Sequence, residues 1–244
     1  MPGDVLTAAE VAATTEDARR RPAPLGPLAL YLLAFYAVWS IYFVVLTPHF
    51  GRGPAYTALE NVAKLAIWTL PVIVLVRVAE GERALDYLKL RRSWRRGLVY
   101  GLGLGLAVSL YLVLLKLRGG GIHFDPFFAA GEWVSGVILI GFTEEVVFRG
   151  FILQKLGARL DFRWANLATS LLFVLVHLPR WIRDERLGPG IAGAALFLLA
   201  FSLLLGWALR RSGSLWACAL AHSLGNFTSF ALGSSATTGL AFLL

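Results

Sequence analysis

Residues 97–115 read GLVYGLGLGLAVSLYLVLL, and this uncharged stretch decides the fold class. A helix of these 19 residues is about 28 Å long, close to the roughly 30 Å thickness of a bilayer's hydrocarbon core. The apolar run extends to residue 117, and similar runs lie at 28–47, 58–79, 133–153, 164–178, 191–209 and 214–232. The sequence therefore predicts an all-α protein, a polytopic transmembrane helix bundle of seven spans, with 237–244 as a possible short eighth.

The composition indicates a membrane protein rather than a soluble one. Hydrophobic residues make up 57% of the chain and charged residues 16%, which is far more apolar than an ordinary soluble domain. The net charge of +8 is spread over short connections between the apolar runs, where basic side chains meet lipid headgroups. This distribution predicts the lipid bilayer, and no nucleic acid, as their partner. The single cysteine, Cys218, excludes an intrachain disulfide.

The basic residues also predict the orientation. With a cytoplasmic N-terminus, the inner connections hold fifteen Lys and Arg residues and the outer connections hold six. Residues 1–27 are polar and lack periodicity, which predicts a mobile cytoplasmic tail ahead of a transmembrane helical domain at 28–244. We therefore expect an integral, multi-pass protein with a cytoplasmic N-terminus, in the plasma membrane of a prokaryotic cell.

Two local patterns predict how the early helices pack. Gly97, Gly101 and Gly105 recur every four residues, which lets another helix approach that face closely. Glu60 and Lys64 are also four apart, near the outer end of their run. We expect these two to neutralise each other on one helix face, as a structural ion pair.

The fourth run contains GFTEEVVFRG at 141–150, which brings three ionisable side chains to membrane depth. Such a charge costs on the order of 2.5–3.5 kcal/mol on insertion scales, so each one needs a partner or a function. Glu145 and Arg149 are four apart and can pair on one face. Glu144 points about 100° away and has Phe148, not a cation, four residues further on. We therefore expect Glu144 to be unpaired, a condition in which burial strengthens a carboxylate as a general base.

The fifth run carries a histidine. Phe173 and His177 share one helix face, and Pro179 is expected to mark the helix end. The run is short for a full span, so we expect it to pack deeply or to extend past Asp161. Taken alone, His177 also fits a purely structural role, as a hydrogen-bonded histidine inside the bundle.

Depth links this histidine to other polar groups. The seventh run places His222 and Asn226 four apart on one face, which also suits an interhelical hydrogen-bond clasp. At about 1.5 Å per residue, Glu144, His177, His222 and Asn226 lie roughly 12–20 Å from the inner ends of their runs. We interpret the shared depth of these groups on three helices as one site.

Three motifs in this region resemble the CAAX-protease and bacteriocin-processing family of intramembrane proteases. They are Glu-Glu-x-x-x-Arg at 144–149, Phe-x-x-x-His at 173–177 and His-x-x-x-Asn at 222–226, in order and on separate helices. The resemblance covers 133–232, the expected catalytic core, whereas the first three runs match only as generic spans. It implies a peptidase that acts in the membrane on a peptide or a membrane-protein substrate.

The resemblance also implies roles for the motif residues. Glu144 and His177 would activate a water, His222 and Asn226 would stabilise the oxyanion, and Glu145, Arg149 and Phe173 would support the site. The cofactor stays open. The sequence lacks the His-Glu-x-x-His signature, yet Glu144, His177 and His222 could offer a zinc ion three ligands and leave a position for water.

Two other classes of function remain open. Buried Glu, Arg and His residues also mark ion paths in transporters, although the sequence shows no paired halves with interrupted helices. A non-proteolytic scaffold or bacteriocin-immunity protein would retain the fold without the chemistry. Replacement of Glu144 separates these classes, because a scaffold would tolerate it and a protease would not.

Overall fold

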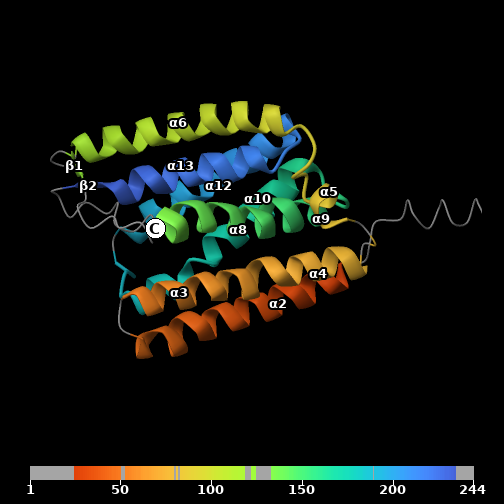
Figure 1. The fold of residues 1–244 in the computed structure, drawn as a ribbon, viewed down its shortest axis with the longest axis horizontal. Coiled ribbons are helices and arrows are strands. Elements are labelled where there is room, and N and C mark those ends of the chain that lie inside the picture. The colour runs from red at the N-terminus through yellow and green to blue at the C-terminus, as the bar shows by residue number, and fades with distance from the viewer. Residues whose placement is uncertain are drawn as a thin grey trace, which may run out of the picture.

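The computed structural model describes residues 25–50, 53–79, 81, 83–118, 122–124, 133–188 and 190–234. These residues are almost all helical, and their long helices lie side by side along one common direction (Figure 1). The predicted segment at 237–244, and the predicted tail as far as residue 24, lie outside the described residues. The first helix begins at Gly26, two residues before the predicted start. Pro27 occupies its first turn, where the missing N–H costs no hydrogen bond.

The chain forms a helical hairpin, then one long helix, then the elements that carry the three motifs. The hairpin comprises α2 (Gly26–Ile41), η1 (Tyr42–Leu46), η2 (Thr47–His49), α3 (Pro54–Ala63), η3 (Lys64–Thr69) and α4 (Leu70–Ala79). A short α5 (Ala84–Tyr87) leads to α6 (Trp94–Arg118). The later helices are η4 (Trp133–Leu139), α8 (Ile140–Glu145), η5 (Val146–Ile152), α9 (Leu153–Gly157), α10 (Phe162–Leu175), α11 (Leu178–Arg183), α12 (Ile191–Ser212) and α13 (Trp216–Ala231).

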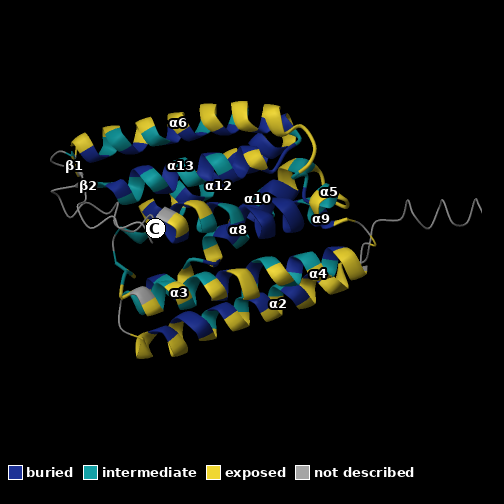
Figure 2. Cartoon of the chain, viewed as in Figure 1, coloured by how far each residue is buried: buried dark blue, intermediate teal, exposed yellow. Residues whose placement is uncertain are grey.

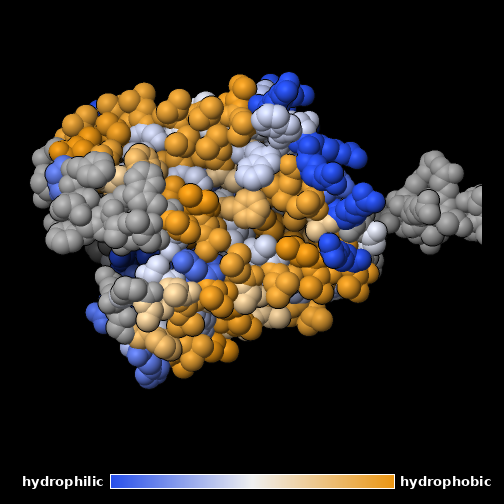
Figure 3. Space-filling view, in the orientation of Figure 1, coloured by the Kyte–Doolittle hydropathy of each residue, from blue (hydrophilic) through white to orange (hydrophobic). Residues whose placement is uncertain are grey.

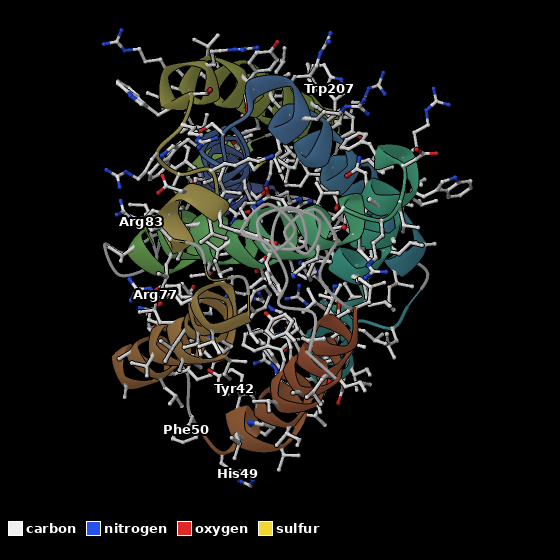
Figure 4. The ribbon with its side chains drawn as sticks, turned by 90° about the vertical axis from the view of Figure 1, so that its right-hand side faces the viewer. Tyr42, His49, Phe50, Arg77, Arg83 and Trp207 are labelled. Carbon is white, nitrogen blue, oxygen red and sulfur yellow. The ribbon has the colours of Figure 1, made fainter. Side chains whose placement is uncertain are left out.

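The elements from η4 to α9 form the central helix of the bundle. Figure 1 shows α8 between the α2–α4 hairpin on one side and α6, α12 and α13 on the other. The same order holds in the view along the bundle from the end that carries Arg77 and Arg83 (Figure 4). Every residue from Thr143 to Leu153 is buried (Figure 2). A helix surrounded by protein on all sides can hold charged groups away from lipid.

The outer surface matches a bilayer environment. Orange, hydrophobic residues cover most of the visible flank, whereas blue, hydrophilic residues form a large group at one end of the bundle and smaller groups at the other (Figure 3). Leu30, Leu33, Val99 and Leu106 are among the exposed apolar side chains. Their exposure is favourable in lipid and unfavourable in water. The chain is an integral, multi-pass membrane protein.

Five helices are long and apolar enough to cross a membrane: Gly26–His49, Ala55–Val78, Trp94–Arg118, Phe162–Arg183 and Ile191–Ser212. The other two predicted spans are absent from this set, which covers only the described residues. The central helix carries Glu144, Glu145, Arg149 and Lys155, and α13 has only 16 residues. The predicted helical membrane bundle is therefore confirmed, whereas the count of seven spans is not.

The predicted glycine face of α6 packs against α13. A Cβ atom added at Gly101 would lie 2.9 Å from the Cβ of Leu220, and one added at Gly105 would lie 2.6 Å from Cδ1 of Leu224. A Cβ atom at Gly97 would meet the residues just before and at the start of α13 at similar distances. These approaches are shorter than van der Waals contact, so glycine allows α13 to lie directly on α6.

The fifth predicted run differs from the expectation in its direction of extension. The helix begins at Phe162 and does not extend past Asp161. It continues instead at its other end, through a turn at His177 into α11. As predicted, α10 ends shortly before Pro179, at Leu175. Pro179 lies in the first turn of the separate helix α11, where a proline needs no hydrogen-bond acceptor.

A short pair of strands also forms, which the sequence did not predict. Strand β1 (Ile122–Phe124) pairs antiparallel with β2 (Leu232–Ser234) in the register Ile122↔Ser234. The pair joins the residues after α6 to the residues after α13 at one end of the bundle. His123, expected in a solvated loop, is exposed in β1, and His49 is exposed at the end of η2.

Candidate active site

A cavity lies between the N-terminal hairpin and the later helices. Its empty space amounts to about 750 Å³ when the open space at its mouth is included. Its apolar lining includes Val108 and Leu112 of α6 and Phe197, Leu198 and Phe201 of α12. Its polar lining includes the four residues predicted to be catalytic, Glu144, His177, His222 and Asn226. The predicted convergence of these side chains is confirmed, and their catalytic roles stay predictions.

Glu145 and Arg149 form the predicted ion pair in the central helix. Arg149 Nη1 donates to Glu145 Oε1 at 2.9 Å, and neither side chain is exposed. Arg149 Nη2 also donates to Ser202 of α12, at 2.7 Å to Oγ and 3.1 Å to the carbonyl oxygen. The guanidinium carbon lies 4.6 Å from the centroid of the Phe173 ring. Arg149 thus joins the central helix to α10 and α12.

Glu145 has a second partner, which fixes the orientation of His222. Nδ1 of His222 lies 2.7 Å from Glu145 Oε1. An ionised carboxylate only accepts hydrogen bonds, so Nδ1 carries a proton. Nε2 points toward Glu144, 4.0 Å from its Oε2. In a neutral ring this Nε2 is an acceptor, and it donates only when His222 is protonated.

His177 is fixed by its own helix turn. It lies in the turn between α10 and α11, and its Nδ1 is 2.8 Å from the carbonyl oxygen of Phe173. A carbonyl oxygen only accepts, so Nδ1 is the donor and Nε2 of the neutral ring is left as an acceptor. The ring centroids of Phe173 and His177 are 5.0 Å apart, as expected for residues on one face. This hydrogen bond is the one expected if His177 has a purely structural role. Its position in the cavity wall also allows His177 to take part in catalysis.

Glu144 is not the unpaired carboxylate that the sequence predicts. Its Oε1 accepts a hydrogen bond from Nζ of Lys64 at 3.4 Å, and both side chains are buried. The prediction counted only cations on the same helix, whereas this one comes from η3 across the cavity. The predicted ion pair between Glu60 and Lys64 is therefore wrong, because Lys64 pairs with Glu144 instead. The other oxygen, Glu144 Oε2, is buried without a hydrogen-bond partner.

Asn226 forms the interhelical hydrogen bond that the structural alternative predicts. Its Nδ2 donates to the carbonyl oxygen of Gly136 at 2.9 Å, which ties α13 to the start of the central helix. An amide nitrogen carries two hydrogens, so one donor is left over. Asn226 also lines the cavity and can direct this second hydrogen toward a bound group.

The predicted zinc ligands do not gather into a metal site in the described part of the chain. No group of three or more His, Cys, Asp and Glu side chains lies close enough there to hold an ion. The ammonium of Lys64 on Glu144 also opposes a second cation at that carboxylate. The residues as arranged do not fit a zinc ion, and its presence stays an untested prediction.

Sequence patterns missed four contributors to this site. Lys64 was recognisable as a buried cation, but the nearby Glu60 offered a simpler partner in the sequence. Ser202 is one hydroxyl in an apolar run and gives no signal. Gly136 contributes a backbone carbonyl, which no side-chain pattern reveals. Arg180, which also lines the cavity, was assigned only to an outer connection.

Comparisons with known proteins agree with the motif analysis. Residues 126–228 match the family model described as type II CAAX prenyl endopeptidase Rce1-like. The match contains all three motifs and most of the cavity's polar lining, and it leaves residues 1–125 and 229–244 outside. The resemblance inferred from the motifs is therefore confirmed. Comparison with curated proteins and with solved structures finds no match.

Proposed function

We propose that this chain, whose residues 126–228 match the CAAX prenyl endopeptidase family, is an intramembrane endopeptidase that hydrolyses a peptide bond of a membrane-associated protein or peptide. The observation that carries the proposal is the cavity itself. A buried carboxylate oxygen without a hydrogen-bond partner, Glu144 Oε2, lies in a wall that also holds two imidazoles and an amide. Such a set supplies both a base and hydrogen-bond donors for acyl transfer to water.

In the proposed mechanism a water donates its hydrogens to Glu144 Oε2 and to Nε2 of His177. Both atoms are acceptors in the protonation states that their other contacts favour. The water oxygen attacks the peptide carbonyl while Glu144 takes its proton. Glu144 then passes this proton to the leaving nitrogen as the C–N bond breaks. The other water proton stays on the attacking oxygen, so the products are a carboxylic acid and an amine, and Glu144 is again ionised.

The oxyanion of the tetrahedral intermediate would be held by His222 and by the second amide hydrogen of Asn226. This role requires a protonated His222, because Nδ1 already donates to Glu145. The carboxylates of Glu144 and Glu145 lie on opposite nitrogens of this ring, at 4.0 Å from Nε2 and 2.7 Å from Nδ1. Negative charge developing on the oxyanion would then lie next to a fixed positive charge.

We extend the proposal to the topology: seven segments cross the membrane, with the N-terminus in the cytoplasm. The support comes from the exposed basic side chains at one end of the bundle, which include Arg91, Arg92, Arg95 and Arg96. Basic residues favour the cytoplasmic side. The central helix and α13 can cross despite their charge or length, because protein covers them.

The proposal is tested by replacing the base. Glu144→Gln keeps size and polarity but removes basicity. We expect the purified variant to fold, and to cleave quenched fluorescent peptides about 10²–10⁴-fold more slowly than wild type. Peptides with and without a thioether-linked farnesyl group form the substrate panel. His222→Ala and Asn226→Ala should each slow cleavage by roughly 10²–10³-fold.

Glu60→Gln is the matched control, since Glu60 lines the same cavity but has no role in the proposed steps. It should leave cleavage close to the wild-type rate. A folded Glu144→Gln protein that cleaves at the wild-type rate would refute the assignment. Metal analysis of the active preparation, and activity after chelation, test the zinc prediction separately.

A further inference from the structure

Lys64 lies at the cavity but outside the region that matches the family. It is the first residue of η3, and only 4% of it is exposed. Its Nζ is 3.4 Å from Glu144 Oε1 and lies 5.9 Å and 5.6 Å from the ring centroids of Trp39 and Trp68. A lysine buried at membrane depth normally has a partner or a function. Here two indole faces and one carboxylate surround the ammonium.

The contact divides the two oxygens of Glu144 between different tasks. Oε1 is held by Lys64, whereas Oε2 is buried without a hydrogen-bond partner and faces Nε2 of His222. A carboxylate rotates about its terminal torsion with little preference unless something holds one oxygen. Holding Oε1 therefore determines which lone pairs Oε2 presents to the cavity.

We propose that Lys64 is a positioning residue for the hydrolytic reaction: it fixes the carboxylate of Glu144 so that Oε2 faces the water. The inference rests on the proposed function and adds to it a residue from the N-terminal hairpin. Trp39 and Trp68 keep the ammonium in place, because cation–π contacts favour one position over their faces. The hairpin thus adds Lys64 to a site whose four predicted catalytic residues lie on later helices.

The test compares Lys64→Met with Lys64→Arg in the peptide-cleavage assay. Lys64→Met should lower kcat by about 10²-fold with KM nearly unchanged, because a rate loss of about this size is typical when a catalytic group is slightly misplaced. Lys64→Arg keeps a cationic donor and should recover at least part of kcat. If Lys64→Met fails to fold, Lys64→Gln, which keeps a neutral donor, takes its place in the comparison.

Lys116→Met is the control for losing a buried lysine. Lys116 donates to the carbonyl oxygens of Ser229 and Leu232 at the end of α13 and does not touch Glu144. This variant should lower thermal stability and leave kcat near the wild-type value. A similar loss of kcat in both lysine variants would show a general structural effect and overturn the proposal.

A double-mutant cycle shows whether Lys64 acts through Glu144. In a Glu144→Gln background, Lys64→Met should cause little further loss of kcat, because the carboxylate that it positions is gone. A further loss as large as in wild type would overturn the positioning role. Failure of the proposed function has a different signature, a fully active Glu144→Gln. An inactive Glu144→Gln with an unaffected Lys64→Met would reject only the lysine.

Discussion

Two adjacent glutamates in the central helix have different environments because the helix turns by about 100° per residue. Glu144 faces the cavity and contacts Lys64, whereas Glu145 faces the interior and contacts both Arg149 and His222. Glu145 therefore stabilises two cations or potential cations with one oxygen. The motif thus places a glutamate proposed to take part in the reaction, Glu144, directly before a glutamate that holds the site together, Glu145.

The first residue-scale prediction concerns Arg149. Arg149→Ala leaves Glu145 buried without its strongest partner and also removes the contacts with Ser202. Breaking a buried ion pair typically costs about 3–5 kcal/mol, so we expect a clear loss of thermal stability and folded yield in detergent, together with lower activity. Arg149→Lys, which keeps the charge but loses the planar fork, should lie between. A fully stable but inactive Arg149→Ala protein would point to direct contact with substrate.

At the scale of elements, sequence analysis succeeded where the interaction is local. The Glu145–Arg149 pair and the Gly97–Gly105 face follow from helical spacing alone, and both are present. The pairing of Lys64 with Glu144 could not be predicted in this way, because 80 residues separate them and only tertiary packing brings them together. The same holds for Ser202, whose role depends on where α12 lies.

Backbone irregularities were also beyond sequence patterns. Lys64 begins one π-helical segment, and Arg149 lies inside another, η5. Such segments are rare and are often found at functional sites. Hydrophobic periodicity does not distinguish them from ordinary helix, so the sequence predicted the helices but not their local widening.

The packing of α6 on α13 gives an element-scale prediction with an internal control. Gly101→Ala would place a Cβ atom 3.0 Å from the carbonyl oxygen of Ala217, in a contact that cannot relax without moving α13. We expect a lower melting temperature and, since α13 carries His222, lower activity. Gly103→Ala, on the same helix with nothing within 4 Å, should be neutral or slightly stabilising. Equal effects of both substitutions would contradict the predicted seam.

At the scale of the whole molecule, the two ends of the bundle differ in charge. Arg77 and Arg83 lie at the end that faces the viewer in Figure 4, and the larger hydrophilic patch of Figure 3 lies at this same end. The sequence predicted this asymmetry from the connections alone, because positive charge in loops depends little on tertiary structure. The order of the helices around the cavity was not predictable, since membrane helices of similar hydropathy can pack in many arrangements.

Cysteine labelling tests the orientation. His49 and Arg92 are exposed and lie at opposite ends of the chain's second span, so in a Cys218→Ala background a cysteine introduced at either position reports one side of the membrane. A membrane-impermeant maleimide applied to intact cells should label His49→Cys and not Arg92→Cys. After the cells are opened, both should react. The reverse pattern in intact cells would place the N-terminus outside.

The 80-residue separation of Lys64 and Glu144 has a consequence for synthesis of the chain. At about 5–20 residues per second, the lysine leaves the ribosome roughly 4–16 s before its carboxylate partner. During this interval the hairpin holds a cation that has only Glu60, one helical turn away, to compensate it. The four-residue spacing, which predicted a permanent Glu60–Lys64 pair, thus fits a pair that exists only until Glu144 is synthesised. Glu144 then arrives in a hairpin whose counter-charge is already in place.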